Sequence, residues 1–143
     1  MDPRDDPNNR YGPHITYFEE PDIIFMALHG DCTEENGLEA LAKQVSFGQG
    51  RKMVFFLMDG TNMGGLSPGM RKAVAKALSQ LPLFGMANYG APLKARVVAK
   101  LVITAVNLFR KDASINPIEF FATEAEARSW INGRREKYRS TLG

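Results

Sequence analysis

The chain is poor in the residues that build most metal and redox sites. Its 143 residues include one cysteine, Cys32, and two histidines, His14 and His29. A single cysteine excludes an internal disulfide framework and a multi-cysteine zinc site. No third ligand accompanies the two histidines at metal-binding spacing. We therefore expect no metal and no cofactor, and a reducing, cytoplasmic location is the default.

Long hydrophobic runs are also missing. The first residues are charged and no apolar stretch lies near them, which argues against a secretory signal. The segment 93–109 is strongly apolar, but it is too short to span a membrane and contains Lys94, Arg96 and Lys100. With 44% hydrophobic and 24% charged residues, the chain is typical of one soluble domain that buries a core without disulfides or metals.

The two halves of the chain carry opposite charge. Residues 1–66 contain 5 Lys and Arg against 11 Asp and Glu, whereas residues 67–143 contain 13 against 5. The basic half could attract an acidic partner, or the two halves could meet each other in the fold. The basic C-terminal residues lack the aromatic stacking platform of nucleic-acid-binding modules, so no nucleic-acid partner is expected.

The apolar pattern predicts an α/β domain over residues 14–132. Residues 1–13 contain three prolines and no apolar run, which predicts a flexible arm. Predicted strands lie at 14–18 and 23–29, paired as a hairpin, and at 53–58, 83–89 and 118–121. The order β-β-α-β-α-β-α-β-α predicts a mixed, mainly parallel sheet with packed helices.

Helix boundaries are marked by capping residues. Thr33 and Ser67 are predicted N-caps, and Thr123 with Glu126 forms a capping box before the last helix. Gly133 is a predicted C-cap, so residues 133–143 are expected to form a basic C-terminal tail.

Four strings carry a family resemblance: MVFFLMDG (53–60), GGLSPGMRKAVAKAL (64–78), LFGMANYGAP (83–92) and PIEFFATEAEARSWI (117–131). In this order, after an opening hairpin, they resemble the SpoIIAA-like branch of the STAS domain family. The resemblance covers residues 14–132. It implies a STAS-like fold and a non-enzymatic regulatory module that acts by protein–protein interaction. It also implies a distant relation to Sec14-like lipid-binding domains, and hence, as an alternative, a lipid or another apolar ligand.

The loop after the third strand is the predicted docking region. Its residues are Asp59, Gly60, Thr61, Gly64, Gly65 and Ser67, and their backbone amides would recognise a protein partner together with the turn at 90–92. In regulatory STAS domains an Asp-Ser-Ser/Thr-x-Gly-like loop carries the phosphoacceptor. Here the string is GGLSPG (64–69), without that pattern. Ser67 is therefore either a plain N-cap or a regulatory phosphoacceptor at a helix start.

Two enzymatic interpretations have less support from the sequence than the docking and ligand hypotheses. The string LMDGT (57–61) resembles part of the Asp-x-Asp-Gly-Thr signature of haloacid-dehalogenase phosphatases, but Leu57 stands where the nucleophilic aspartate is needed. Cys32 precedes a helix start, which could lower its pKa, yet no partner histidine is recognisable in a triad pattern. No catalytic residue is predicted.

The segment 93–109 is the most informative helix. At about 100° per residue its apolar side chains fill a broad arc. The candidate ligand or membrane face comprises Val97, Leu101, Val102, Ala105, Leu108 and Phe109. This arc suits a core helix, a lid over an apolar pocket, or a helix on a membrane surface. The docking hypothesis predicts a tightly packed interior, whereas the ligand hypothesis predicts an apolar cavity under this helix.

Overall fold

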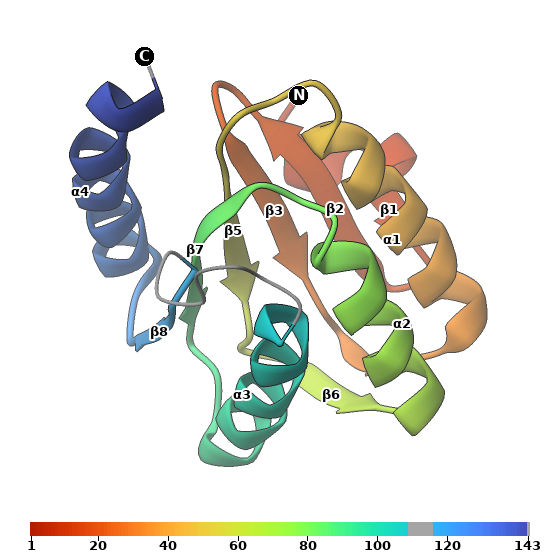
Figure 1. Ribbon diagram of the computed structural model, residues 1–143. Helices are drawn as coiled ribbons and strands as arrows, with labels where there is room; N and C mark the ends of the chain where they lie inside the picture. Colours follow the sequence, from red (N-terminus) through yellow and green to blue (C-terminus); the bar gives the residue numbers. More distant parts are fainter. Residues whose placement is uncertain (109–115, 143) are drawn as a thin grey trace.

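The structure, a computed structural model, describes residues 1–108 and 116–142. One mixed sheet has the strand order β1-β2-β3-β5-β7-β8 (Figure 1). Its strands are β1 (Arg10–Tyr11), β2 (His14–Glu19), β3 (Ile23–Ala27), β5 (Val54–Asp59), β7 (Leu83–Tyr89) and β8 (Ile118–Phe121). A separate pair is formed by β4 (Gly30–Cys32) and β6 (Met63–Leu66). The helices are α1 (Glu34–Gly48), α2 (Pro68–Leu78), α3 (Leu93–Asn107) and α4 (Glu124–Leu142).

The strand directions confirm the predicted α/β class with a mostly parallel, mixed sheet. β2 pairs antiparallel with β1 on one side and with β3 on the other. β3, β5, β7 and β8 pair in parallel, and each connection between them includes a helix. The segment 60–66, predicted as a loop, contains β6, which pairs with β4.

The sheet separates two apolar clusters because successive side chains on a strand point to opposite faces. On one face, which we call the three-helix face, Ile24, Met26 and Phe56 pack with α1, α2 and α3. On the other, the α4 face, Phe25 and Leu57 pack with α4. Figure 1 shows α4 on the opposite side of the sheet from the other helices. Strands buried on both sides explain the continuous apolar run that predicted β5.

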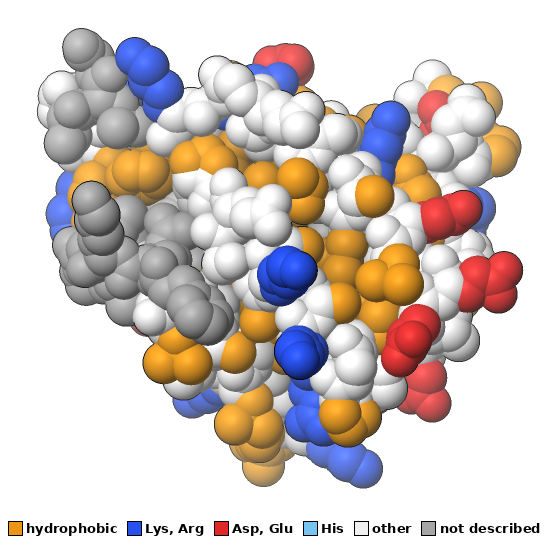
Figure 2. All heavy atoms as spheres, turned by 45° about the vertical axis from the view of Figure 1, so that its right-hand side comes forward, with side chains coloured by type: hydrophobic (Ala, Val, Ile, Leu, Met, Phe, Trp, Pro, Cys, Tyr) orange, Lys and Arg blue, Asp and Glu red, His pale blue; other side chains and the backbone are white. Residues whose placement is uncertain are grey.

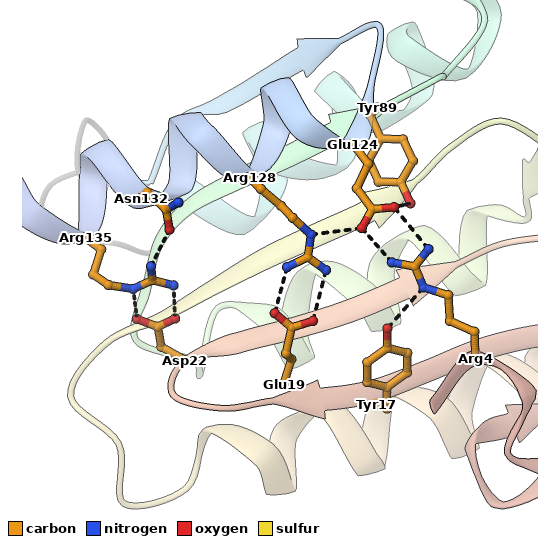
Figure 3. Close-up of polar contacts among 9 residues, drawn as sticks. All are labelled: Arg4, Tyr17, Glu19, Asp22, Tyr89, Glu124, Arg128, Asn132 and Arg135. Atoms are coloured by element: carbon orange, nitrogen blue, oxygen red, sulfur yellow. Dashed lines mark hydrogen bonds and ion pairs between the residues drawn. The ribbon is translucent and has the colours of Figure 1, made fainter. Parts of the chain in front are cut away.

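The α4 face carries a chain of charged pairs above its apolar cluster (Figure 3). Arg4 donates to both carboxylate oxygens of Glu124 at 3.0 and 2.7 Å. Arg128 donates to the same carboxylate at 2.9 Å and to both oxygens of Glu19 at 2.7 and 2.9 Å. These bidentate pairs fix the orientation of α4 because both partners are planar forks.

The electrostatic consequences centre on Glu124. Its hydrogen bond from Arg4 is the main reason that its pKa is lowered to about 2. Farther along α4, Arg135 donates to Asp22 at 2.8 and 2.7 Å, and this pair is the more buried one. The hydroxyl of Tyr89 donates to Glu124 at 3.2 Å, and burial raises the pKa of this tyrosine.

The segment predicted as a flexible arm makes specific contacts. Residues 3–5 and 7–9 form short 3-10 turns, and β1 pairs with β2, so β2 is not the edge strand. The guanidinium of Arg4 also lies 4.4 Å from the ring centroid of Phe25. The composition of residues 1–13 predicted flexibility because it contains no local signal of order. The residues that hold Arg4 in place lie far away in the sequence.

Gly133 is not a C-cap, because α4 continues through it to Leu142. The additional turns contact the sheet through their own side chains. Arg134 donates to the carbonyl of Phe84 at 2.6 Å, and the ring of Tyr138 packs on that of Phe84 with centroids 5.3 Å apart. These contacts outweigh the weak helix propensity of glycine.

Candidate functional site

The predicted docking loop is tied together by its own hydrogen bonds. The amide of Gly60 donates to the carbonyl of Tyr89 at 2.9 Å, and the amide of Thr61 donates to Asp59 Oδ1 at 3.0 Å. The amide of Gly65 donates to Asp31 Oδ1 at 2.7 Å. These three amides are therefore engaged within the chain. A partner at this loop would have to recognise its shape and side chains.

Gly64 lies where β6 passes closely over β4. A Cβ at this position would stand 2.5 Å from the carbonyl carbon of Gly30 and 2.5 Å from Asp31 Oδ1. Only glycine permits this approach, so Gly64 has a packing role that does not require a bound phosphate.

Ser67 is the N-cap of α2, as predicted. Its Oγ accepts from the amide of Met70 at 3.1 Å. The carboxylate of Glu34 lies nearby, because its Oε1 is 2.6 Å from the place where a Cβ of Gly69 would stand. A phosphate on Ser67 would meet this negative charge as well as the helix amides, which weakens the electrostatic advantage of the helix start. Phosphorylation of Ser67 stays a prediction.

Cys32 and the histidines do not form a nucleophilic pair in the structure. Cys32 is buried, and burial raises the pKa of its thiol, which is opposite to what a nucleophile needs. His14 is also buried, and its Nδ1 accepts from the amide of His29 at 3.1 Å. Within residues 1–108 and 116–142, no three His, Cys, Asp or Glu side chains gather where they could hold a metal ion.

The candidate face of α3 is divided between the core and the surface. Val102 is buried and Ala105 is half-buried. Val97, Leu101 and Leu108 instead point outward, with 54%, 56% and 72% of their surface exposed. Phe109, the last predicted member, lies outside the described residues.

The residues of α3 that face the core differ from most of the predicted ones. They are Ala95, Ala99, Val102, Ile103 and Val106. Periodicity alone gives large apolar residues priority, whereas here two alanines are placed inward. In the described ranges, no helix combines the length and hydropathy that a membrane crossing needs.

An apolar cavity of about 80 Å³ lies on the three-helix face, between the sheet and the helices α1, α2 and α3. Five of the seven methionines of the chain line it: Met26, Met58, Met63, Met70 and Met86. Ala40 of α1 and Ala99, Val102 and Ile103 of α3 complete much of the wall. Methionine is unbranched and flexible, so these walls can change shape more easily than walls of branched residues.

Gln44 and Asn88 carry the strongly polar side chains among the described residues that line the cavity. Gln44 Nε2 donates to Thr16 Oγ1 at 3.1 Å. Asn88 is 2% exposed, and its Oδ1 has no hydrogen-bond partner within the part of the chain that the structure describes. The sequence analysis missed Asn88, although an asparagine inside the buried strand LFGMANY is an observable signal.

A groove on the outer surface runs between α2 and α3. Its α2 wall carries Arg71, Lys72 and Lys76, and its α3 wall carries Leu101 and Leu108. Figure 2 shows apolar side chains exposed beside lysine and arginine side chains on one side of the molecule. The basic half of the chain therefore contributes both charge and exposed apolar surface to this groove.

No family model, curated protein or solved structure matches the chain.

Proposed function

We propose that the chain is a non-enzymatic, STAS/SpoIIAA-like module that binds a small apolar molecule beneath α3. The cavity on the three-helix face is the single observation that carries this proposal. Apolar pockets with few polar groups are the usual form of small-molecule sites. The docking hypothesis and the ligand hypothesis from the sequence differed in this respect, since only the ligand hypothesis expected space under this helix.

The size of the cavity limits the ligand in the present conformation. A cavity of about 80 Å³ is smaller than the engineered cavity of about 150 Å³ that binds benzene in another protein. A ligand of benzene size therefore requires the methionine side chains, or α3 itself, to move outward. Longer lipid chains require a larger displacement of α3.

Toluene is a suitable first probe because it is compact and apolar. We expect NMR shift changes at residues that line the cavity when the full chain is titrated with toluene. Ala40→Leu places additional atoms in the cavity and should weaken toluene binding at least tenfold. Ala42→Leu is the matched control, because Ala42 is exposed on the same helix. Equal binding by both variants, or no binding by the unmodified protein, would contradict the proposal.

Native mass spectrometry of protein purified from its source cells gives a second test. A bound apolar molecule that Ala40→Leu excludes and Ala42→Leu retains would identify the natural ligand. Bare protein in every preparation would count against a carrier role.

A second candidate function, protein docking, is supported by the groove between α2 and α3. Three basic residues beside exposed leucines fit an acidic amphipathic helix of a partner protein. This location differs from the loop 59–67 that the sequence predicted, where three amides are engaged internally. The regulatory role implied by the family resemblance would then operate through α2 and α3.

Charged substitutions distinguish this candidate from ligand binding. Leu101→Asp should abolish capture of a partner from source-cell extract, because it places a charge in the apolar wall of the groove. Leu38→Asp is the control, since Leu38 is a similarly exposed leucine on α1. Capture that survives Leu101→Asp, or is lost equally in both variants, would exclude the groove as the docking site.

A further inference from the structure

We propose that the cavity selects mainly apolar molecules that carry one hydrogen-bond donor, such as a hydroxyl group, and that Asn88 accepts this donor. The inference rests on the proposed ligand-binding function and adds to it the chemical class of the ligand. It depends on one side chain whose hydrogen-bonding capacity is left unused by the rest of the chain.

Asn88 lies in β7, two residues after Met86, so both side chains are on the three-helix face. Both line the cavity. Asn88 is 2% exposed and its Oδ1 has no partner among the described residues. A buried acceptor without a donor destabilises the folded state, and such atoms are rare in proteins. A ligand that supplies the donor would remove this penalty on binding.

The amide oxygen of Asn88 packs closely against Gly60, the residue that follows β5. Oδ1 lies beside Gly60, at only 2.5 Å from where a Cβ of that residue would stand. Any larger residue at position 60 would press on the amide. The absence of a side chain at Gly60 therefore allows the Asn88 amide to take its place in the cavity wall.

Other polar groups nearby do not offer the same acceptor. Gln44, the second amide in the cavity wall, donates from its Nε2 to Thr16, and its acceptor Oε1 is not among the buried, unpartnered atoms of the described residues. Among the described residues, His14 Nε2 and Asn116 Oδ1 are also buried without partners, but neither residue lines the cavity. Asn88 is thus the one residue of the described lining with a buried polar atom that has no partner.

Phenol and toluene test this selectivity because they have the same number of non-hydrogen atoms and differ in one hydroxyl group. Asn88→Leu replaces the amide by an apolar group of similar size. We expect this variant to bind phenol about tenfold more weakly than the unmodified protein, the usual loss for one hydrogen bond. Toluene should bind it equally well or more tightly. Asn62→Leu, at an exposed asparagine, should change neither affinity.

The melting temperature of unliganded Asn88→Leu distinguishes a ligand-binding role of Asn88 from a structural role, because the two roles change it in opposite directions. If Asn88 serves the ligand, Asn88→Leu should melt at a higher temperature, because an unpaired buried acceptor is removed. A lower melting temperature would overturn the inference, since it would show that the fold itself needs the amide.

The affinity outcomes separate this inference from the proposed function. Binding of both probes with equal losses in Asn88→Leu, or with no loss of phenol binding, would overturn the role of Asn88 and leave the cavity as a ligand site. Failure of both probes to bind the unmodified protein would overturn the two proposals together.

Discussion

On the three-helix face, the sheet is covered by apolar side chains that include many methionines and enclose a cavity. On the α4 face, an apolar cluster is bordered by arginines whose guanidinium groups pair with carboxylates, and the guanidinium of Arg4 also lies over the ring of Phe25. Dispersion contacts among methionines tolerate small displacements, whereas bidentate ion pairs hold one geometry. We infer that the three-helix face is the one that can deform around a ligand, and that the α4 face holds the sheet in shape.

The largest expected effect lies in the buried pair on the α4 face. Arg135→Ala should destabilise the protein by about 3 kcal/mol, because it leaves the carboxylate of Asp22, which is 5% exposed, without its partner. Urea unfolding measures the change. Arg139→Ala is the control, since Arg139 pairs with Glu136 at the surface, and it should cost at most about 0.5 kcal/mol. Similar losses in both variants would mean that the α4 face is no more rigid than an ordinary surface.

Glu124 should make stability on the α4 face depend on pH. Glu124→Gln should cost about 1–2 kcal/mol at pH 7, because two charge-assisted interactions weaken and solvent screens part of their strength. The pKa of Glu124 is about 2 in the folded chain, below its ordinary value of 4.5. Its stabilising effect is therefore complete above pH 4.5 and is lost as the pH falls toward 2.

Unfolding curves at pH 7, 4 and 3 check this dependence. The difference between the unmodified protein and Glu124→Gln should shrink as the pH falls. Glu136→Gln, at an exposed glutamate, should give no such trend. A difference that is constant from pH 7 to pH 3 would show that the pairs contribute through packing alone.

Deformability of the three-helix face predicts tolerance to similar apolar residues. Met70→Leu should cost less than about 1.5 kcal/mol even though Met70 is only 1% exposed, because neighbouring methionines can adjust. Thermal unfolding measures this cost, with Met53→Leu, outside the cavity, as control. A much larger loss at Met70 would indicate a tightly fitted wall and would weaken the case for an adaptable cavity.

The smallest losses of stability are expected from removing one helix N-cap on each face of the sheet. Ser67→Ala and Thr123→Ala should each cost about 1 kcal/mol, because each hydroxyl accepts from one amide of the first helical turn. Denaturant titration of both variants checks this. If partner binding is also unchanged in both Ser67→Ala and Ser67→Asp, this hydroxyl serves as a cap and a regulatory role for it is excluded.

Local signals predicted the parts of the fold that depend on neighbouring residues. The apolar runs located β5 and β7, and hydroxyl residues located the starts of α1, α2 and α4. The ordering of residues 1–13 could not be predicted in this way, because Arg4 binds Glu124, which lies 120 positions later. The same applies to the second half of α4, where Arg134 binds Phe84 of β7 and Arg135 binds Asp22 in the turn between β2 and β3.

The candidate site was only partly accessible to sequence reasoning. An apolar cavity under the helix at 93–109 was one of the stated alternatives. Of the inward residues of that helix only Val102 belonged to the predicted face, because Leu101 and Val102 are both apolar and only the packing against the sheet decides which is buried. The apolar periodicity did not point to Asn88 as a site residue. Its importance lies in the missing hydrogen-bond partner of Oδ1 among the described residues, which only the three-dimensional structure shows.

The outer strands of the sheet have a consequence for how the protein meets other chains. One margin is β1, with two residues, and the other is β8, with four. Such short margins offer few unpaired backbone groups to an extended peptide, which discourages intermolecular strand addition and fibril-like growth. Association with other molecules is thereby directed toward helical surfaces, and crowded conditions should favour the monomeric sheet over sheet-to-sheet polymers.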